Sequence, residues 1–269
     1  MSKAKPGGRN PLQDNDLEEV EPILLENRAL LLISRKLFPS IMLTHEQKRI
    51  NWFRHCLKEF HRSEGEEWAN GITHFIGVIF SVVAITMMAI FCAQNRSAIY
   101  TVSCAIYGTC LLVVYSVSTL YHIIRDFKPK CIFQLLDHCS IYLLIAGSYM
   151  PFTLLVLAPQ KAWLMFGIEW GLALTGILVE CLCSRRIADI ISLPIFIIMG
   201  WLIVTTFVDV YRNLNVPAFV LLCVGGGTYT IGVIFFLFDK VPYMHTVWHV
   251  FVLLASICHW VAITFFIVL

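Results

Sequence analysis

The sequence carries little charge for its length. Asp, Glu, Lys and Arg make up 14% of its 269 residues, and hydrophobic residues make up 58%, whereas soluble domains contain about 25% charged residues. The net charge is only +2, and the basic residues lie between apolar segments, which argues against a nucleic-acid partner. The composition therefore excludes an ordinary soluble domain and indicates an integral membrane protein that crosses the bilayer several times, in contact with membrane lipids.

The sequence also lacks the cysteine patterns of disulfide-rich or zinc-finger domains. Its ten cysteines are scattered, most of them in or beside apolar runs, where cysteine behaves as a small hydrophobic residue, and no C-x-x-C pair occurs. Residues 1 to 40 contain no basic-then-apolar opening with a small-residue cleavage site, so we expect no cleaved signal peptide. Neither a disulfide framework nor a cysteine-based zinc site is expected.

The first quarter of the chain differs from the rest. Residues 1–43 predict a mobile cytoplasmic tail through which a signalling partner can bind: residues 1–21 are rich in proline, glycine and acidic residues, and residues 23–43 are an apolar stretch, too interrupted to span, that suits the membrane interface. Residues 44–68 predict a helix along the membrane surface, because Thr44 and Gln47 have the spacing of a capping box. Residues 69–269 are the predicted membrane domain.

Seven apolar runs follow, each near the roughly 20 residues that cross a bilayer of about 30 Å. They lie at about 71–93, 99–124, 133–157, 162–183, 190–211, 218–238 and 246–268. The gaps are short, so consecutive helices are antiparallel neighbours in one bundle. Most basic residues beside the spans lie before the first span and in every second connection, so that they fall on one side of the membrane. The positive-inside rule then places the N-terminus in the cytoplasm and the C-terminus outside. The predicted fold class is an all-α seven-transmembrane helix bundle.

Polar residues from three spans fall at one predicted depth, near the cytoplasmic face. His245 and His249 lie four residues apart at the start of span seven, so both imidazoles face one side of the helix. His122 ends span two, and Asp137 begins span three. Three imidazoles with an open fourth position can bind zinc and still admit water, which a carboxylate can hold or deprotonate. Ser118 lies one turn deeper than His122 and can hydrogen-bond the water or a ligand.

These residues also have simpler explanations. A single histidine at a helix end commonly makes an interfacial hydrogen bond, and Asp137 can stabilise the start of span three through the helix dipole. His74 is a further candidate, either as a substitute ligand or as a hydrogen-bond partner, whereas His138 points about 100° away from Asp137 around the helix. His259 lies ten residues beyond His249, roughly 15 Å along the span, and cannot share that metal.

The fourth span carries two acids and a glycine pair. Acids within a membrane are costly and indicate function, but the sequence suggests no partner for Glu169 or Glu180. Glu180, near the cytoplasmic edge, can instead extend to the surface. Gly167 and Gly171 form a G-x-x-x-G pattern, for which ordinary close helix packing is the simpler interpretation.

Four ordered motifs resemble the haemolysin III family, which belongs to the wider progestin and adipoQ receptor (PAQR) group. They are EEWANGITH at 66–74, STLYH at 118–122, LDHCSIYLLIAGSYMPF at 136–152 and PYMHTVWH at 242–249. The resemblance covers about residues 66–269 and implies a zinc ion near the cytoplasmic leaflet. The implied ligands are His122, His245 and His249, with Asp137 near the bound water and Ser118 at the serine of the family's S-x-x-x-H motif.

The resemblance also implies two classes of function. Adiponectin receptors of this family are associated with ceramide hydrolysis, so we expect a zinc-dependent hydrolase acting on a lipid amide or ester, with Asp137 and Ser118 in catalytic roles. The alternative is a receptor for a hormone, lipid or steroid, in which zinc is structural. A pore-forming, haemolysin-like protein is a third and weaker hypothesis, because no span carries the repeated polar stripe that would line a pore. The sequence leaves plasma, Golgi and endolysosomal membranes open.

Overall fold

A computed structural model describes residues 62–94, 97–183 and 185–269. All regular secondary structure in these ranges is helical. Residues 64–68 form the first turns of a long membrane helix. The predicted mobile tail, the capping box at Thr44 and the rest of the predicted surface helix lie outside the described residues.

The described residues contain seven helical segments that are long and apolar enough to cross a membrane, which confirms the seven predicted spans. The first four are single helices, and so is the sixth; the fifth combines α7, η1 and α8, and the seventh combines α10 and η2. The elements are α3 (Glu64–Gln94), α4 (Ala98–Ile123), α5 (Phe127–Leu154), α6 (Pro159–Leu182), α7 (Arg185–Trp201), the 3₁₀ turn η1 (Leu202–Thr206), α8 (Phe207–Asn213), α9 (Val216–Leu237), α10 (Met244–Ile263) and the π-helical turn η2 (Thr264–Val268).

Local sequence signals set several helix ends. Pro159 opens α6, and Pro217 lies in the first turn of α9, where proline's missing N–H leaves no hydrogen bond unmade. Asn215 precedes α9, and its Oδ1 accepts a hydrogen bond from the backbone N–H of Ala218 at 2.9 Å. This is the usual chemistry of a helix N-cap.

The fifth span is interrupted. α7 ends at Trp201, and the chain passes through η1 before α8 completes the crossing. Tyr149 of α5 lies at the break, where its hydroxyl donates to the Met199 carbonyl at 2.7 Å and accepts from the Ile203 N–H at 2.8 Å. A side chain that supplies the missing backbone partners lets a membrane helix tolerate such a break. The predicted span is confirmed, but its interruption was not predicted.

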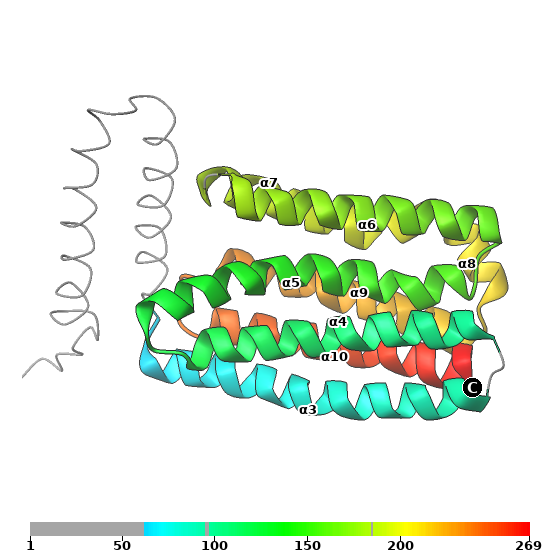
Figure 1. Cartoon of the computed structure of the whole chain (residues 1–269), viewed down its shortest axis with the longest axis horizontal. Helices are drawn as coiled ribbons and strands as arrows, with labels where there is room; N and C mark the ends of the chain where they lie inside the picture. The colour runs from blue at the N-terminus through cyan, green and yellow to red at the C-terminus, as the bar shows by residue number, and fades with distance from the viewer. Residues whose placement is uncertain (1–61, 95–96, 184) are drawn as a thin grey trace, which may run out of the picture. The chain divides into compact units, whose positions relative to one another are not determined.

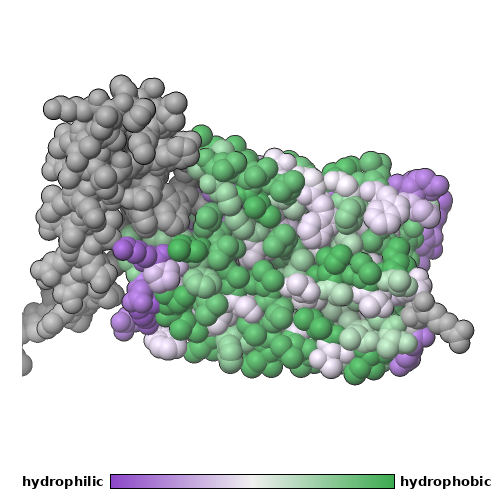
Figure 2. All heavy atoms as spheres, in the orientation of Figure 1, coloured by the Kyte–Doolittle hydropathy of each residue, from purple (hydrophilic) through white to green (hydrophobic). Residues whose placement is uncertain are grey.

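Helices that follow one another in the chain pack side by side (Figure 1). α3 packs on α4, α4 on α5, α5 on α6 and α6 on α7, while α9 packs on α10 and α10 returns to α3. Large hydrophobic side chains are exposed on the outside of the bundle. Figure 2 shows hydrophobic side chains over the middle of the bundle and hydrophilic ones at its two ends. This is the surface of a multi-pass integral membrane protein.

Close packing on α6 uses a different glycine from the predicted pair. A Cβ atom at Gly176 would lie 2.1 Å from the ring of Tyr142, so this glycine makes room for a large aromatic side chain of α5. At Gly167 and Gly171, no described neighbour lies within 4 Å of the place a Cβ would take. Helix packing through the G-x-x-x-G pattern is therefore not found among the described residues, because that face of α6 points away from the other described helices.

Candidate metal centre

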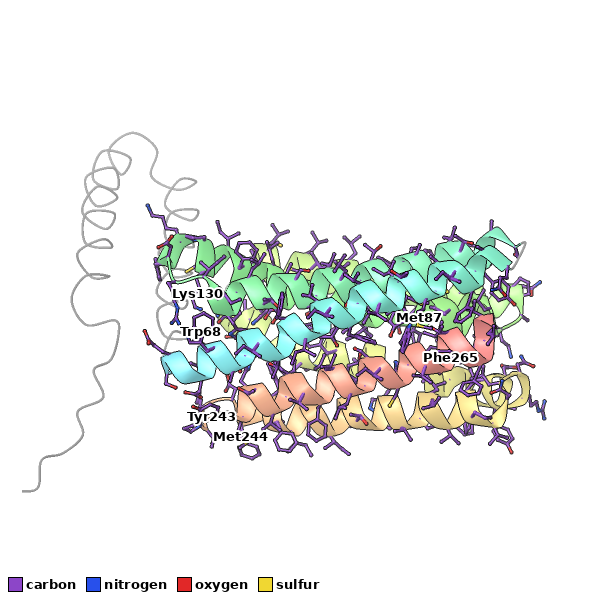
Figure 3. All side chains as sticks on the ribbon, turned by 90° about the horizontal axis from the view of Figure 1, so that it is seen from below. Trp68, Met87, Lys130, Tyr243, Met244 and Phe265 are labelled. Carbon is purple, nitrogen blue, oxygen red and sulfur yellow. The ribbon has the colours of Figure 1, made fainter. Side chains whose placement is uncertain are left out.

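Three histidines from two helices meet at one end of the bundle. His122 lies in the last turn of α4, and His245 and His249 lie in the first two turns of α10. One ring nitrogen from each can be chosen so that all three lie within 4.8 Å of one another. All three side chains are buried, and His249 is fully enclosed. The structure thus brings the three predicted ligands into one group that can hold a metal ion. Figure 3 labels four residues at this end: Trp68, Lys130, Tyr243 and Met244.

The start of α10 is anchored by α3. Tyr243 precedes the helix with a φ of 64°, in the left-handed region that residues with side chains seldom adopt. Its backbone N–H donates to Oε1 of Glu66 at 2.9 Å. Such a conformation costs about 1–3 kcal/mol and persists where the surroundings enforce it. Because His245 and His249 follow directly, this anchor sets the height and rotation at which both imidazoles face α4.

Glu67 orients the histidine on α4. Nδ1–H of His122 donates to Oε2 of Glu67 at 2.8 Å, and the same oxygen lies 3.3 Å from Nζ of Lys130. Lys130 also donates to the Tyr121 carbonyl at 2.9 Å, so the acid lies in a buried network. A hydrogen bond from Nδ1 to a carboxylate fixes the ring and directs Nε2 toward a metal. Glu67 belongs to the EEWANGITH motif, but its sequence position alone does not indicate a role at the metal site.

Asn70, one turn further along α3, orients the second helix of the site. Its side-chain oxygen accepts a hydrogen bond from Thr246, and its backbone carbonyl lies 3.4 Å from Nδ1 of His249. Nδ1 of His249 therefore carries the proton, and Nε2 is left as the lone-pair donor. That Nε2 is buried and has no hydrogen-bond partner among the described residues. A buried, unsatisfied nitrogen facing two other imidazoles fits a metal ligand.

We predict that Glu67→Gln lowers the affinity for zinc by about 10–100-fold, the usual cost of losing an outer-shell carboxylate. Glutamine keeps the shape but accepts a weaker, uncharged hydrogen bond from His122 and leaves Lys130 without its anionic partner. Competition with a chromophoric chelator measures the affinity, and a thermal melt checks folding. Glu64→Gln, the same change at an exposed position in the first turn of α3, should bind zinc like wild type. Equal affinities for all three proteins would show that Glu67 does not tune the site.

His74 forms one wall of the site without joining the ligand group. Its ring stacks on that of His249, with centroids 3.5 Å apart and planes at 21°, and meets Tyr115 edge-on. Neither of its ring nitrogens has a hydrogen-bond partner among the described residues. Two roles were predicted for His74, and neither is found. His74 is not part of the three-histidine group, and it makes no hydrogen bond to a described residue. Stacking holds the ring of His249 in place.

Asp137 and Ser118 are both buried. Asp137, on α5, is 5% exposed and lines the same cavity as His74. Ser118 lies one turn before His122 on α4, and its hydroxyl is buried with no hydrogen-bond partner among the described residues. Their catalytic roles stay predictions.

A cavity of about 140 Å³ lies beside the site and is lined mainly by α5, α7, α9 and α10. His74 and Asp137 line it, and so does His259, ten residues after His249 on α10. Most of its wall between these points is aliphatic or aromatic. A mostly apolar cavity with a few polar groups is typical of a binding site for a small amphiphilic molecule.

The two acids of α6 are both buried. Glu180 lies 3.6 Å from Nδ1 of His138 and accepts a hydrogen bond from Ser192 of α7. Extension of Glu180 to the surface is therefore wrong: the side chain turns inward because α5 and α7 supply partners. Glu169 is also fully enclosed, and neither of its oxygens has a hydrogen-bond partner among the described residues.

The fold and this site together define a class: a seven-helix, multi-pass membrane protein with a buried three-histidine group at one end of its bundle. Three imidazoles suit a transition metal such as zinc, copper, iron or nickel better than the oxygen-preferring magnesium or calcium. Comparison with known proteins places the chain within that class.

The sequence profile described as "Haemolysin-III related" matches residues 63–260. Hemolysin-3 of Bacillus cereus is 40% identical over 202 residues, covering 75% of this chain and 92% of the relative. The Hemolysin-3 homolog of Bacillus subtilis is 39% identical over 201 residues, covering 75% and 94%. The human protein named monocyte to macrophage differentiation factor is 30% identical over 208 residues, covering 74% and 83%. The chain belongs to the haemolysin III family of the PAQR group, as its motifs predicted.

Proposed function

We propose that the protein is a zinc-dependent hydrolase that cleaves an amide or ester bond in a membrane lipid, with ceramide-like lipids as the substrate class and a role in signalling. The observation that carries this proposal is the cavity, which has Asp137 and the ring stacked on His249 at one end and an apolar wall beyond them. A reactive group and an apolar chain can thus be bound by one continuous site.

The donor set favours zinc. His122 and His249 each direct Nδ1–H to an oxygen of α3, and three neutral imidazoles with a fourth position left open are a common catalytic zinc site. Zinc held in this way polarises a carbonyl group and makes water more acidic. The protein's own contribution is to keep the rings of His122 and His249 in the metal-binding tautomer through Glu67 and Asn70.

The remaining residues supply positioning and proton transfer. Asp137 accepts the proton from the attacking water and returns it to the leaving amine or alcohol, which is general base and then general acid catalysis. Ser118 donates a hydrogen bond to the lipid carbonyl or to water. The apolar wall of the cavity binds the acyl chain and excludes bulk water, so the carboxylate acts in a medium that strengthens its interactions.

The proposed orientation puts the site near the cytoplasmic leaflet. Basic residues precede the first span in the sequence and lie in or beside the connections at the end of the bundle that contains the three histidines, whereas in or beside the opposite connections there are only Arg96, Lys161 and Arg212. The positive-inside rule assigns the first of these ends to the cytoplasm. The substrate would then be drawn from the inner leaflet.

A receptor is the second candidate, and the geometry of the ligand set favours it specifically. His122 comes from α4, His245 and His249 come from α10, and the oxygens that accept hydrogen bonds from His122 and His249 come from α3. A metal ion would therefore join α4 to α10, with α3 attached through these hydrogen bonds, and a hormone, lipid or steroid in the cavity could shift the helices relative to one another. In this case the metal is structural, and the N-terminal tail carries the signal.

A hydrolysis assay on the purified, zinc-loaded full chain separates the two. We expect release of free fatty acid from ceramides or lysolipids, detected by mass spectrometry. Stripping the metal with a chelator should abolish release, and adding zinc back should restore it. Folded, zinc-replete protein that releases no fatty acid from any lipid of the panel would rule out the hydrolase and leave the receptor.

A further inference from the structure

A second polar group lines the cavity far from the metal site. His259 lies ten residues after His249 on α10, which is about 15 Å along the helix. It is 7% exposed, and its ring packs against those of Phe152 and Tyr229, with centroids 5.4 and 5.5 Å away. Its distance from the three-histidine group leaves it no part in metal binding. The cavity therefore has a polar group about 15 Å along α10 from the metal site.

The ring of His259 is held in one orientation. Its Nε2 lies 3.4 Å from the backbone carbonyl of Leu222 on α9, to which it donates. Gly225 makes room for the same edge of the ring, since a Cβ atom there would lie 2.3 Å from Cδ2. With the proton on Nε2, Nδ1 is an acceptor.

That acceptor is unsatisfied, whereas three nearby hydroxyl groups, those of Tyr115, Tyr229 and Ser256, have partners. Nδ1 of His259 is buried and has no hydrogen-bond partner among the described residues. The nearby hydroxyls bond one another: Tyr115 donates to Oγ of Ser256 at 2.8 Å, and Tyr229 lies 2.7 Å from the same atom. A buried acceptor without a donor, in a residue that lines a cavity, is suited to a donor on a bound molecule.

We propose that His259 is a specificity-determining residue that accepts a hydrogen bond from a hydroxyl group on the lipid chain held in the cavity. This inference rests on the proposed function, because it assumes that the lipid's carbonyl end lies at the metal site. An extended chain with carbon–carbon bonds of about 1.5 Å advances about 1.25 Å per carbon, so 15 Å corresponds to roughly 12 carbons. The preferred ligand class is a fatty acyl chain with a hydroxyl near its twelfth carbon.

Three fatty acids test the proposal by direct binding to zinc-loaded, full-length protein. The acids are octadecanoic acid, 12-hydroxyoctadecanoic acid and 2-hydroxyoctadecanoic acid, whose hydroxyl lies beside the carboxyl group. We expect the 12-hydroxy acid to bind about tenfold more tightly than octadecanoic acid, the effect of one added hydrogen bond to a buried acceptor. The 2-hydroxy acid should show no preference that depends on His259.

Two variants assign that preference to the ring nitrogen. His259→Phe keeps an aromatic ring but removes the acceptor, and should lose the preference for the 12-hydroxy acid with zinc content unchanged. His259→Asn retains a side-chain acceptor and should keep part of it. Equal binding of the three acids by wild type would overturn the proposal, and so would a preference for the 12-hydroxy acid that survives in His259→Phe. The comparison of the three acids on wild-type protein is decisive even if a variant fails to fold.

These experiments can refute the role of His259 and the hydrolase activity independently of each other. Protein that prefers the 12-hydroxy acid but cleaves no lipid keeps the role of His259 and refutes the hydrolase. Protein that cleaves lipids without any preference among the three acids keeps the hydrolase and refutes the role of His259.

Discussion

Replacing His249 with alanine is expected to lower the affinity for zinc by more than about 100-fold, beyond the loss caused by removing an outer-shell partner. His249 is central to the site, because its ring lies 5.1 Å from that of His122 and 4.5 Å from that of His245 between centroids. Its removal leaves two imidazoles and a cavity open to water. Metal analysis of the purified variant should find almost no zinc where wild type retains it.

His138→Ala is the matched control for this change. His138 is also a membrane-helix histidine at the same end of the bundle, but it pairs with Glu180 and lies outside the three-histidine group. We expect the control to retain zinc. Full zinc content in a folded His249→Ala protein would contradict both the hydrolase and the receptor, since each requires the metal at this place.

The second large effect is expected at Asp137. We predict that Asp137→Asn keeps zinc and fold but lowers the rate of lipid hydrolysis by about 10²–10⁴-fold, the range for loss of a general acid or base. Asparagine preserves the size of the side chain and cannot accept the proton of water. Initial rates on a saturating ceramide substrate, together with zinc content, measure the effect.

Asp126→Asn makes the same change at an exposed position just before α5 and should leave the rate unaltered. An Asp137→Asn protein that hydrolyses lipid at the wild-type rate would remove Asp137 from the mechanism. Loss of zinc together with activity would instead make Asp137 a metal ligand, which is a different chemistry from the one proposed.

The features that sequence predicted best are those set by local patterns. The seven spans follow from hydrophobic length, and their positions agree with the helices observed. The ligand trio followed from the i, i+4 spacing of His245 and His249 and from the depth assigned to His122. Depth in a membrane is counted along each helix, so residues from distant segments can be matched without any knowledge of packing.

The features that sequence missed depend on which helices become neighbours. Glu67 lies 55 residues from His122, and Asn70 lies 179 residues from His249. No periodicity joins such pairs. An acid in the first turn of a membrane helix was the one signal available for Glu67, and it has the simpler meaning of a favourable interaction with the helix dipole.

Glu180 and the break in the fifth span illustrate the same point. Their partners, His138 and Tyr149, both come from α5. Without knowledge of how α5 packs against α6 and α7, the sequence predicts a surface position for Glu180 and one continuous helix for the fifth span. Intramembrane polar groups find partners on neighbouring helices because lipid offers none.

X-ray absorption at the zinc edge on wild-type protein purified from zinc-replete cells tests the central claim most directly. The account predicts about one zinc per chain with three imidazole nitrogens at about 2.0–2.1 Å and a light atom in the remaining position. Absence of zinc, or a site with cysteine sulfur at about 2.3 Å, would contradict the assignment of His122, His245 and His249 as the metal centre.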